Sequence, residues 1–160
     1  MRKIGLIFLN FDSKITKKIV KGMKEVLLPQ EYQISVFEAI EEENLETVER
    51  CVAETEIPIL VIDSSKDTDR FLTEAVIRLF EIMNNPLFMI SNFEDVNVDV
   101  LPYLYNTVGD ILLETAIVKD LTEVKYETIF FSPEREVAFT SIVKSDATNA
   151  DDLKTLLENY

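Results

Sequence analysis

Apolar and polar residues follow two different periods along this chain, and each period predicts one kind of element. Short runs that are almost entirely apolar are typical of strands buried on both faces of a parallel sheet. One further run alternates polar and apolar residues, which favours a strand nearer a sheet edge (32–39). Together these runs predict five strands, at residues 4–11, 32–39, 57–62, 87–90 and 111–118.

Segments with apolar residues at three- and four-residue spacing lie between these runs and predict amphipathic helices. The first helix follows Asp12 or Ser13, either of which can cap it, and ends before Pro29. The second helix is expected to be capped by Asn44. Its apolar face is predicted to consist of Leu45, Val48, Cys51 and Val52. Further helices are predicted at about 69–83 and 99–107.

Strands that alternate with helices predict a series of βαβ units with right-handed crossovers. We therefore expect an α/β fold, a three-layer αβα sandwich with a flavodoxin-like parallel sheet of five strands. The end of the chain adds an extra strand at about 137–143 and a closing helix at about 151–159, while 126–131 fits a strand or a helix end. Residues 1–160 contain no linker or repeat, so a single domain is predicted.

The net charge and the cysteine content indicate which partners and which cellular compartment to expect for this domain. The net charge of −14 repels phosphate backbones and anionic lipid surfaces. No apolar stretch approaches the roughly 20 residues that span a bilayer, so neither nucleic acid nor a membrane is expected as a partner. The single cysteine, Cys51, has no second cysteine for an internal disulfide, which indicates a reducing compartment and a cytoplasmic location. Cys51 itself is interpreted as a small buried apolar residue.

The chain contains no histidine, which limits the chemistry it can perform. Ser-His and Cys-His nucleophile pairs and His-based metal sites are excluded. The three glycines form neither a dinucleotide-binding motif nor a P-loop, and no metal site or bound cofactor is predicted. In open α/β sheets, ligands bind beyond the carboxyl ends of the strands. The residues that directly follow the strands are therefore the candidates for a site.

Several stretches of the chain resemble TIR domains, in the same order along the sequence. One of them, Asp69-Arg70-Phe71-Leu72-Thr73-Glu74, is similar to a helix motif in which an aromatic residue precedes a glutamate. Arg70 stands at the aromatic position here, with Phe71 beside it. The other similar stretches are residues 7–14, 48–65, 86–93 and the pair Leu101-Pro102. The resemblance implies a TIR-like core at 1–131, followed by a strand and a helix at 132–160.

In TIR domains that cleave NAD⁺, the helix glutamate is the catalytic residue, and the resemblance places Glu74 in that role. A carboxylate there would support loss of nicotinamide and the positive charge that develops on the ribose. The resemblance implies NAD⁺ as the substrate, bound near Asn10, Phe11, Ser64, Arg70 and Phe71. The spacing of Arg70, Glu74 and Arg78 equally fits an ion-pair ladder on a helix surface.

Receiver domains of two-component systems share the predicted fold and provide an alternative. They carry acidic residues after the first strand, a phospho-accepting aspartate after the third, Ser or Thr after the fourth and Lys after the fifth. This chain has Asp12, Asp63, Ser91 and Lys119 in those places. Carboxylates would hold Mg²⁺ while the aspartate attacks phosphorus and the lysine neutralises the acyl phosphate.

The sequence therefore predicts a TIR-like signalling or defence domain. Its expected mode of action is self-association or binding of a protein partner, and the resemblance leaves open whether it also hydrolyses NAD⁺. A receiver-like phospho-acceptor domain, active or degenerate, is the alternative.

Overall fold

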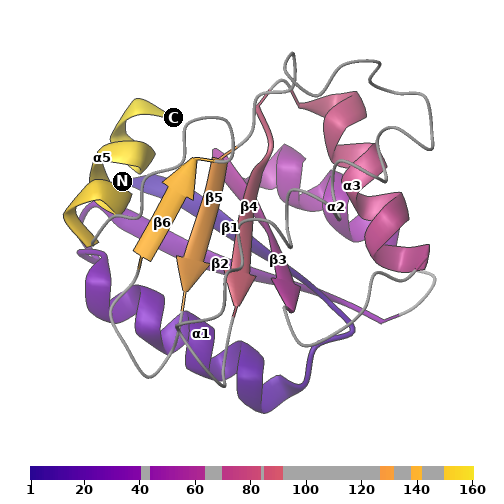
Figure 1. Cartoon of the computed structure of the whole chain (residues 1–160), viewed down its shortest axis with the longest axis horizontal. Helices are drawn as coiled ribbons and strands as arrows, with labels where there is room; N and C mark the ends of the chain where they lie inside the picture. The colour runs from indigo at the N-terminus through magenta and orange to yellow at the C-terminus, as the bar shows by residue number, and fades with distance from the viewer. Residues whose placement is uncertain (41–43, 64–69, 84, 92–126, 132–137, 142–149) are drawn as a thin grey trace.

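The structure, a computed structural model of the chain, describes residues 1–40, 44–63, 70–83, 85–91, 127–131, 138–141 and 150–160. A sheet of six strands runs through the middle of this part of the chain (Figure 1), in the spatial order β2-β1-β3-β4-β5-β6. Neighbouring strands from β2 to β5 pair in parallel, and β6 pairs with β5 in the antiparallel direction. The strands are β1 (Arg2–Leu9), β2 (Tyr32–Ala39), β3 (Ile57–Asp63), β4 (Leu87–Ser91), β5 (Glu127–Phe131) and β6 (Ala138–Ser141).

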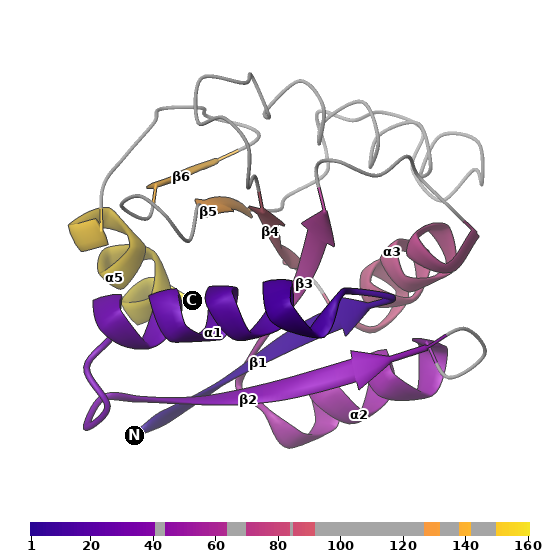
Figure 2. The same cartoon turned by 90° about the horizontal axis from the view of Figure 1, so that it is seen from below.

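Helices cover both faces of this sheet. They are α1 (Ser13–Val26), α2 (Asn44–Glu54), α3 (Arg70–Ile82) and α5 (Ala150–Asn159). Figure 2 shows α1 and α2 on opposite sides of β1 and β2. This follows from the strand order, because the right-handed crossovers from β1 to β2 and from β2 to β3 run in opposite directions across the sheet. None of the helices in the described ranges combines the length and apolar character needed to cross a membrane.

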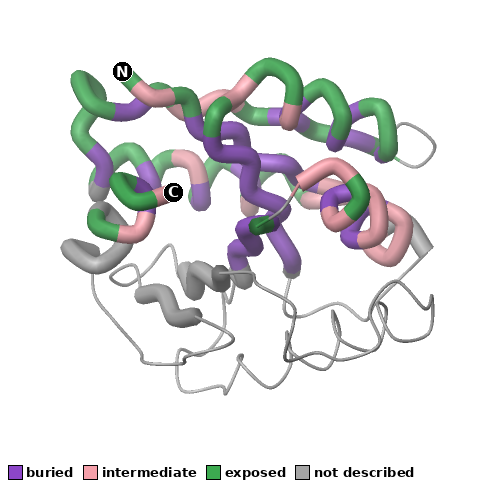
Figure 3. Tube along the Cα trace, turned by 90° about the horizontal axis from the view of Figure 1, so that it is seen from above, coloured by how far each residue is buried: buried purple, intermediate pink, exposed green. Residues whose placement is uncertain are grey.

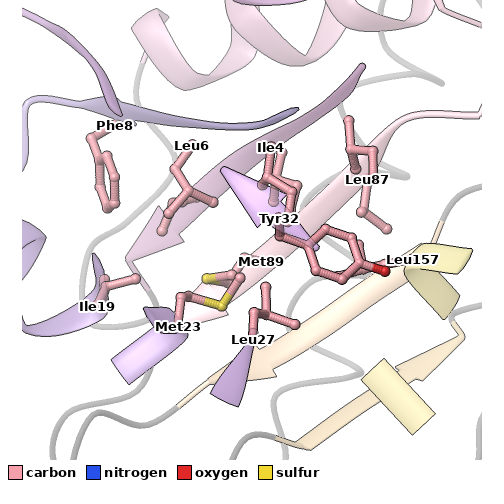
Figure 4. Packing of buried hydrophobic residues seen from close by; sticks show 13 residues of the cluster. Ile4, Leu6, Phe8, Ile19, Met23, Leu27, Tyr32, Leu87, Met89 and Leu157 are labelled. Atoms are coloured by element: carbon pink, nitrogen blue, oxygen red, sulfur yellow. The ribbon is translucent and has the colours of Figure 1, made fainter. Parts of the chain in front are cut away.

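Alternation along the strands sends side chains into two separate cores. On β1, Ile4, Leu6 and Phe8 face α1 and α5, whereas Ile7 faces α2 and α3. Figure 3 shows the buried residues concentrated on the central strands and the exposed ones on the outer surfaces of the helices. Figure 4 shows Met23 of α1 and Met89 of β4 pointing towards each other in the first of these cores. The continuous apolar runs in the sequence reflect this burial on both faces.

The predicted α/β architecture with a parallel sheet is confirmed. The first four predicted strands and the first three predicted helices form β1–β4 and α1–α3, with limits that shift by two residues or fewer at most ends. The segment at 126–131, left open between strand and helix end, forms the parallel strand β5. The strand and helix predicted near the end of the chain form β6 and α5. The helix predicted at 99–107 and the strand predicted at 111–118 lie outside the described residues.

Residues near the two ends of the chain contact each other beside the amino ends of the strands. The guanidinium group of Arg2 donates hydrogen bonds to the carbonyl oxygens of Leu157 and Tyr160 at the end of α5. It also pairs with Glu56, which precedes β3. A cation at the carboxyl end of a helix is favourable because the last carbonyl groups carry partial negative charge. Leu157 is fully buried, so α5 is anchored both by this charge and by packing.

Helix α2 approaches β1 so closely that only glycine fits at residue 5. A Cβ atom added there would collide with the Sγ atom of Cys51, and it would lie 2.8 Å from Oγ1 and 2.9 Å from Cγ2 of Thr55. Cys51 is buried, as the sequence predicted, and burial raises the pKa of its thiol to about 11. The thiol is therefore a packing group rather than a nucleophile at neutral pH.

Gly5→Ala is expected to lower the free energy of unfolding by about 1–3 kcal/mol, because the added methyl group overpacks the contact between β1 and α2. Chemical denaturation measures this change. In a Cys51→Ala background the loss should be smaller, since the largest clash is then relieved. The control is Gly22→Ala, because Gly22 is half-exposed and lies inside α1. This substitution should leave the free energy of unfolding unchanged or raise it, since alanine favours a helix more than glycine does. Equal effects at both glycines would contradict the interpretation of residue 5.

Candidate functional site

The strand order changes direction between β1 and β3. The chain moves from β1 outwards to β2, and then crosses back to β3 and onwards to β4. In open parallel sheets, the loops that leave such a pair of strands diverge to opposite faces and leave a crevice at the carboxyl ends. The candidate site is therefore the end of the sheet where β1 and β3 finish.

Asn10 is the first residue after β1 and has a left-handed backbone conformation, with φ of 58°. Its N–H donates to the carbonyl oxygen of Ala39 at 3.0 Å, which fixes the end of β1 against the end of β2. Asparagine tolerates this conformation better than most residues that carry a Cβ atom. The predicted site residue Asn10 thus lies at the carboxyl end of β1, as the site requires.

Phe11 and Asp12 turn away from this point towards α1. The ring of Phe11 packs edge-on against Phe8 with 5.2 Å between centroids, at the side of the core that α1 covers. The Oδ1 atom of Asp12 accepts a hydrogen bond from the backbone N–H of Lys14 at 2.8 Å, so of the two predicted candidates Asp12, and not Ser13, caps α1. Within the described ranges, no group of three or more acidic or cysteine side chains is placed to hold a metal ion.

Glu74 lies near the start of α3 and is half-buried. The next predicted member of its ladder, Arg78, pairs with Glu49 of α2 at 2.8 Å and with Glu81 at 2.9 Å. Arg78 therefore joins α3 to α2. Arg70 and Phe71 begin α3, where only the backbone is described, and Ser64 lies outside the described residues.

The ion pair between Arg78 and Glu49 links α3 to α2. Both helices run back from the carboxyl ends of parallel strands, so they point in the same direction. Glu74 precedes Arg78 by four residues, and Asn44 precedes Glu49 by five. At a rise of about 1.5 Å per residue, Glu74 lies about 6 Å before Arg78 along α3 and Asn44 about 7.5 Å before Glu49 along α2, so both are displaced from the ion pair towards the carboxyl ends of the strands. Both are on the face of the sheet that carries α2 and α3.

A second estimate, which compares distances along α2 and along β1, also places Asn44 beside the end of β1. Cys51 packs directly over Gly5, and Asn44 lies seven residues before Cys51 on α2. That distance is about 10 Å along the helix, and Leu9 is about 13 Å beyond Gly5 along the strand. Asn44 also lies on the same stripe of α2 as the buried residues Val48 and Cys51, which is the stripe that faces the sheet.

The prediction that Asn44 caps α2 is wrong. Asn44 is the first residue of the helix, is only 1% exposed, and neither Oδ1 nor Nδ2 has a hydrogen-bond partner within the described part of the chain. A buried polar group left without a partner costs about 1–3 kcal/mol. Of the predicted apolar face of this helix, Val48 and Cys51 are buried and Val52 packs against the same core, whereas Leu45 is 39% exposed.

A signal for Asn44 was present in the sequence. The positions 44, 48, 51 and 55 follow the helical spacing of one face, and Val48 and Cys51 were both predicted to be buried. Continuing that face by one turn places Asn44 in the interior. Asparagine directly before an apolar helix is so typical of caps that the cap was the natural interpretation.

Asp63 and Ser91, the residues of the receiver-like alternative, end neighbouring strands. They are direct partners in the parallel register of β3 and β4. Lys119, the third member of that alternative, lies outside the described residues.

Large apolar side chains are exposed around the carboxyl half of β2. Ile40 is 75% exposed and Val36 is 41% exposed, and Leu45 follows at the start of α2. Among the described strands β2 is the outermost on its side of the sheet, so its outer edge has no strand paired to it there. An edge strand with exposed apolar neighbours is a surface on which another chain can pair.

No protein-family model matches the chain, and no curated protein shows significant sequence similarity to it.

Proposed function

We propose that this chain is a TIR-like signalling or defence domain that acts through self-association or a protein partner, and that it hydrolyses NAD⁺ at the carboxyl end of its sheet. One observation carries the proposal. Asn10 directly follows β1, Asn44 begins α2 and Glu74 belongs to α3, and all three lie at the end of the fold where the strand order changes direction. The proposal includes the flavodoxin-like three-layer arrangement that the resemblance implies.

Glu74 is the group that would act on the substrate. Cleavage of the bond between nicotinamide and ribose passes through an oxocarbenium-like state, and a nearby carboxylate stabilises the positive charge that develops. A half-buried carboxylate suits this task better than a fully exposed one, because partial exclusion of water strengthens its field. The chain has no histidine that could take over the role of the carboxylate.

The surface beside β2 supports the proposed mode of action. It combines an outermost strand with the exposed side chains of Val36, Ile40 and Leu45. Pairing of strand edges would satisfy backbone N–H and carbonyl groups and would bury these side chains at the same time.

The purified protein is expected to release nicotinamide from NAD⁺, and Glu74→Gln should lower the rate about a hundredfold or more, as removal of a transition-state-stabilising group does. Chromatography of the products measures both. Glu81→Gln is the matched control, because Glu81 is exposed on the same helix and pairs with Arg78. No nicotinamide at any protein concentration, or equal rates for Glu74→Gln and the unchanged chain, would contradict the activity.

Self-association is expected to increase with protein concentration in sedimentation velocity runs, and Ile40→Asp should abolish it. Because each copy carries a net charge of −14, added salt should strengthen the association by screening the repulsion. The control is Leu28→Asp, which introduces the same charge at a side chain 42% exposed, beyond the other end of β2. A chain that stays monomeric at all salt and protein concentrations, and retains no partner protein, would refute this mode of action.

A receiver-like phospho-acceptor domain is the second candidate, and it is favoured by the register of β3 and β4. The backbones of Asp63 and Ser91 are paired at the carboxyl ends of adjacent strands, which is where a receiver domain carries its phospho-acceptor and its Ser or Thr. Asp12 does not favour this candidate, since its carboxylate caps α1.

Under the second candidate, acetyl phosphate with Mg²⁺ would add one phosphoryl group to Asp63, because an aspartate carboxylate can act as the nucleophile. Mass spectrometry of the intact protein detects the addition, and Asp63→Asn should prevent it. An unchanged mass for the natural sequence would eliminate this candidate.

A further inference from the structure

The side chain of Asn44 is a buried polar group for which the fold provides no partner. It is 1% exposed, and both its Oδ1 and its Nδ2 atom lack hydrogen bonds within the described residues. Buried side-chain amides are normally bonded, and each exception calls for a physical explanation. Leucine has the same branching of heavy atoms and no polar atoms, so it would lie beside Val48 and Cys51 without an unpaired amide. The amide is therefore a feature that packing alone does not require.

The position of this amide is that of a ligand-binding group. It lies at the amino terminus of α2, on the stripe that faces the sheet, and beside the carboxyl end of β1. Glu74 lies four residues before Arg78 on the neighbouring helix α3, and Arg78 pairs with Glu49 of α2. The unsatisfied amide and the proposed catalytic carboxylate thus belong to the same end of the same face.

The charge around Asn44 selects the kind of group that it can bind. A helix amino terminus usually attracts anions. Here the first turn of α2 carries Glu46, and residues 41–43, which directly precede Asn44 in the sequence, are all glutamate. These carboxylates repel a phosphate, so the group that bonds to Asn44 should be neutral or attached to a cationic ring.

The unpaired Oδ1 and Nδ2 atoms of Asn44 also indicate which hydrogen-bonding groups a ligand should carry. A carboxamide presents one acceptor and one donor side by side. Its best complement is a ligand edge with a donor beside an acceptor, as in a primary carboxamide or the N6/N7 edge of adenine. NAD⁺ contains both, the first on a cationic nicotinamide ring.

We propose that Asn44 is a ligand-binding residue that recognises a neutral donor–acceptor edge, either a primary carboxamide or an adenine edge, through paired hydrogen bonds from Oδ1 and Nδ2. The choice of ligand rests on the proposed function, since NAD⁺ supplies both edges. The binding itself does not depend on cleavage by Glu74.

The experiment uses nicotinamide and adenosine as separate probes with the full chain, because neither contains the bond between nicotinamide and ribose. Calorimetry is expected to detect binding of one of them, and the responding probe identifies the edge. Asn44→Leu should weaken that binding by about tenfold or more, because the ligand's own polar atoms are then left unpaired. Thr47→Val is the matched control, since it also removes a buried polar group from α2 and should leave the affinity nearly unchanged.

The stability of the Asn44→Leu variant is a second measurement, and it is expected to stay the same or rise while the affinity for the probe falls. Without ligand, Asn44→Leu should unfold at the same or a higher denaturant concentration than the natural sequence, because an unsatisfied amide is replaced by an apolar group. In the unchanged protein, the side-chain amide signals of Asn44 in NMR spectra should shift when the responding probe is added.

Several outcomes would overturn the proposal. They are absence of binding by both probes, equal affinity in Asn44→Leu, unmoved Asn44 amide signals, and a loss of stability or folding in Asn44→Leu, which would reveal an amide already satisfied by ordered water. Failure of the proposed function gives a different result, namely no nicotinamide release from NAD⁺ while binding that depends on Asn44 persists.

Discussion

The contact between α2 and Gly5 on β1 is the constraint on which the arrangement of the candidate site depends. Because residue 5 has no side chain, Cys51 and Thr55 press directly onto the central strand, and the height of α2 along the sheet is thereby fixed. The ion pair between Glu49 and Arg78 joins α2 to α3 on the same face of the sheet. The contact in the middle of the sheet thus sets how closely α2 lies against the central strand.

The side-chain amide of Asn44 is a polar group at a buried position where the fold would be more stable with an apolar side chain. Apolar side chains fill the interior on each face of the sheet, and a leucine at position 44 would extend the interior on the face that carries α2 and α3. Proteins commonly retain such locally unfavourable groups where a ligand has to be recognised. The left-handed backbone of Asn10 is a second local cost at the same end of the sheet. Together they favour this end as the functional part of the domain.

Charge and apolar surface act in opposite directions on any assembly of this chain. A net charge of −14 opposes the approach of two copies at long range, but salt at physiological concentration screens charges beyond about 8–10 Å. At shorter range, the unpaired outer edge of β2 and the exposed Ile40 and Val36 offer backbone hydrogen bonds and apolar contact. Association through this surface would therefore respond to ionic strength more strongly than the fold does.

The α/β class, the first four strands and three helices, and the burial of Cys51 could be predicted from the sequence alone, and so could capping of the first helix by Asp12 or Ser13. These features follow from hydrophobic period and local hydrogen bonding, which act over a few residues. Long-range contacts in the folded chain were needed to show that Asn44 is buried rather than capping, that Arg78 of α3 pairs with Glu49 of α2, and that Asp63 pairs with Ser91. Helix height, strand order and register arise from contacts between residues far apart in the chain, and no local pattern encodes them.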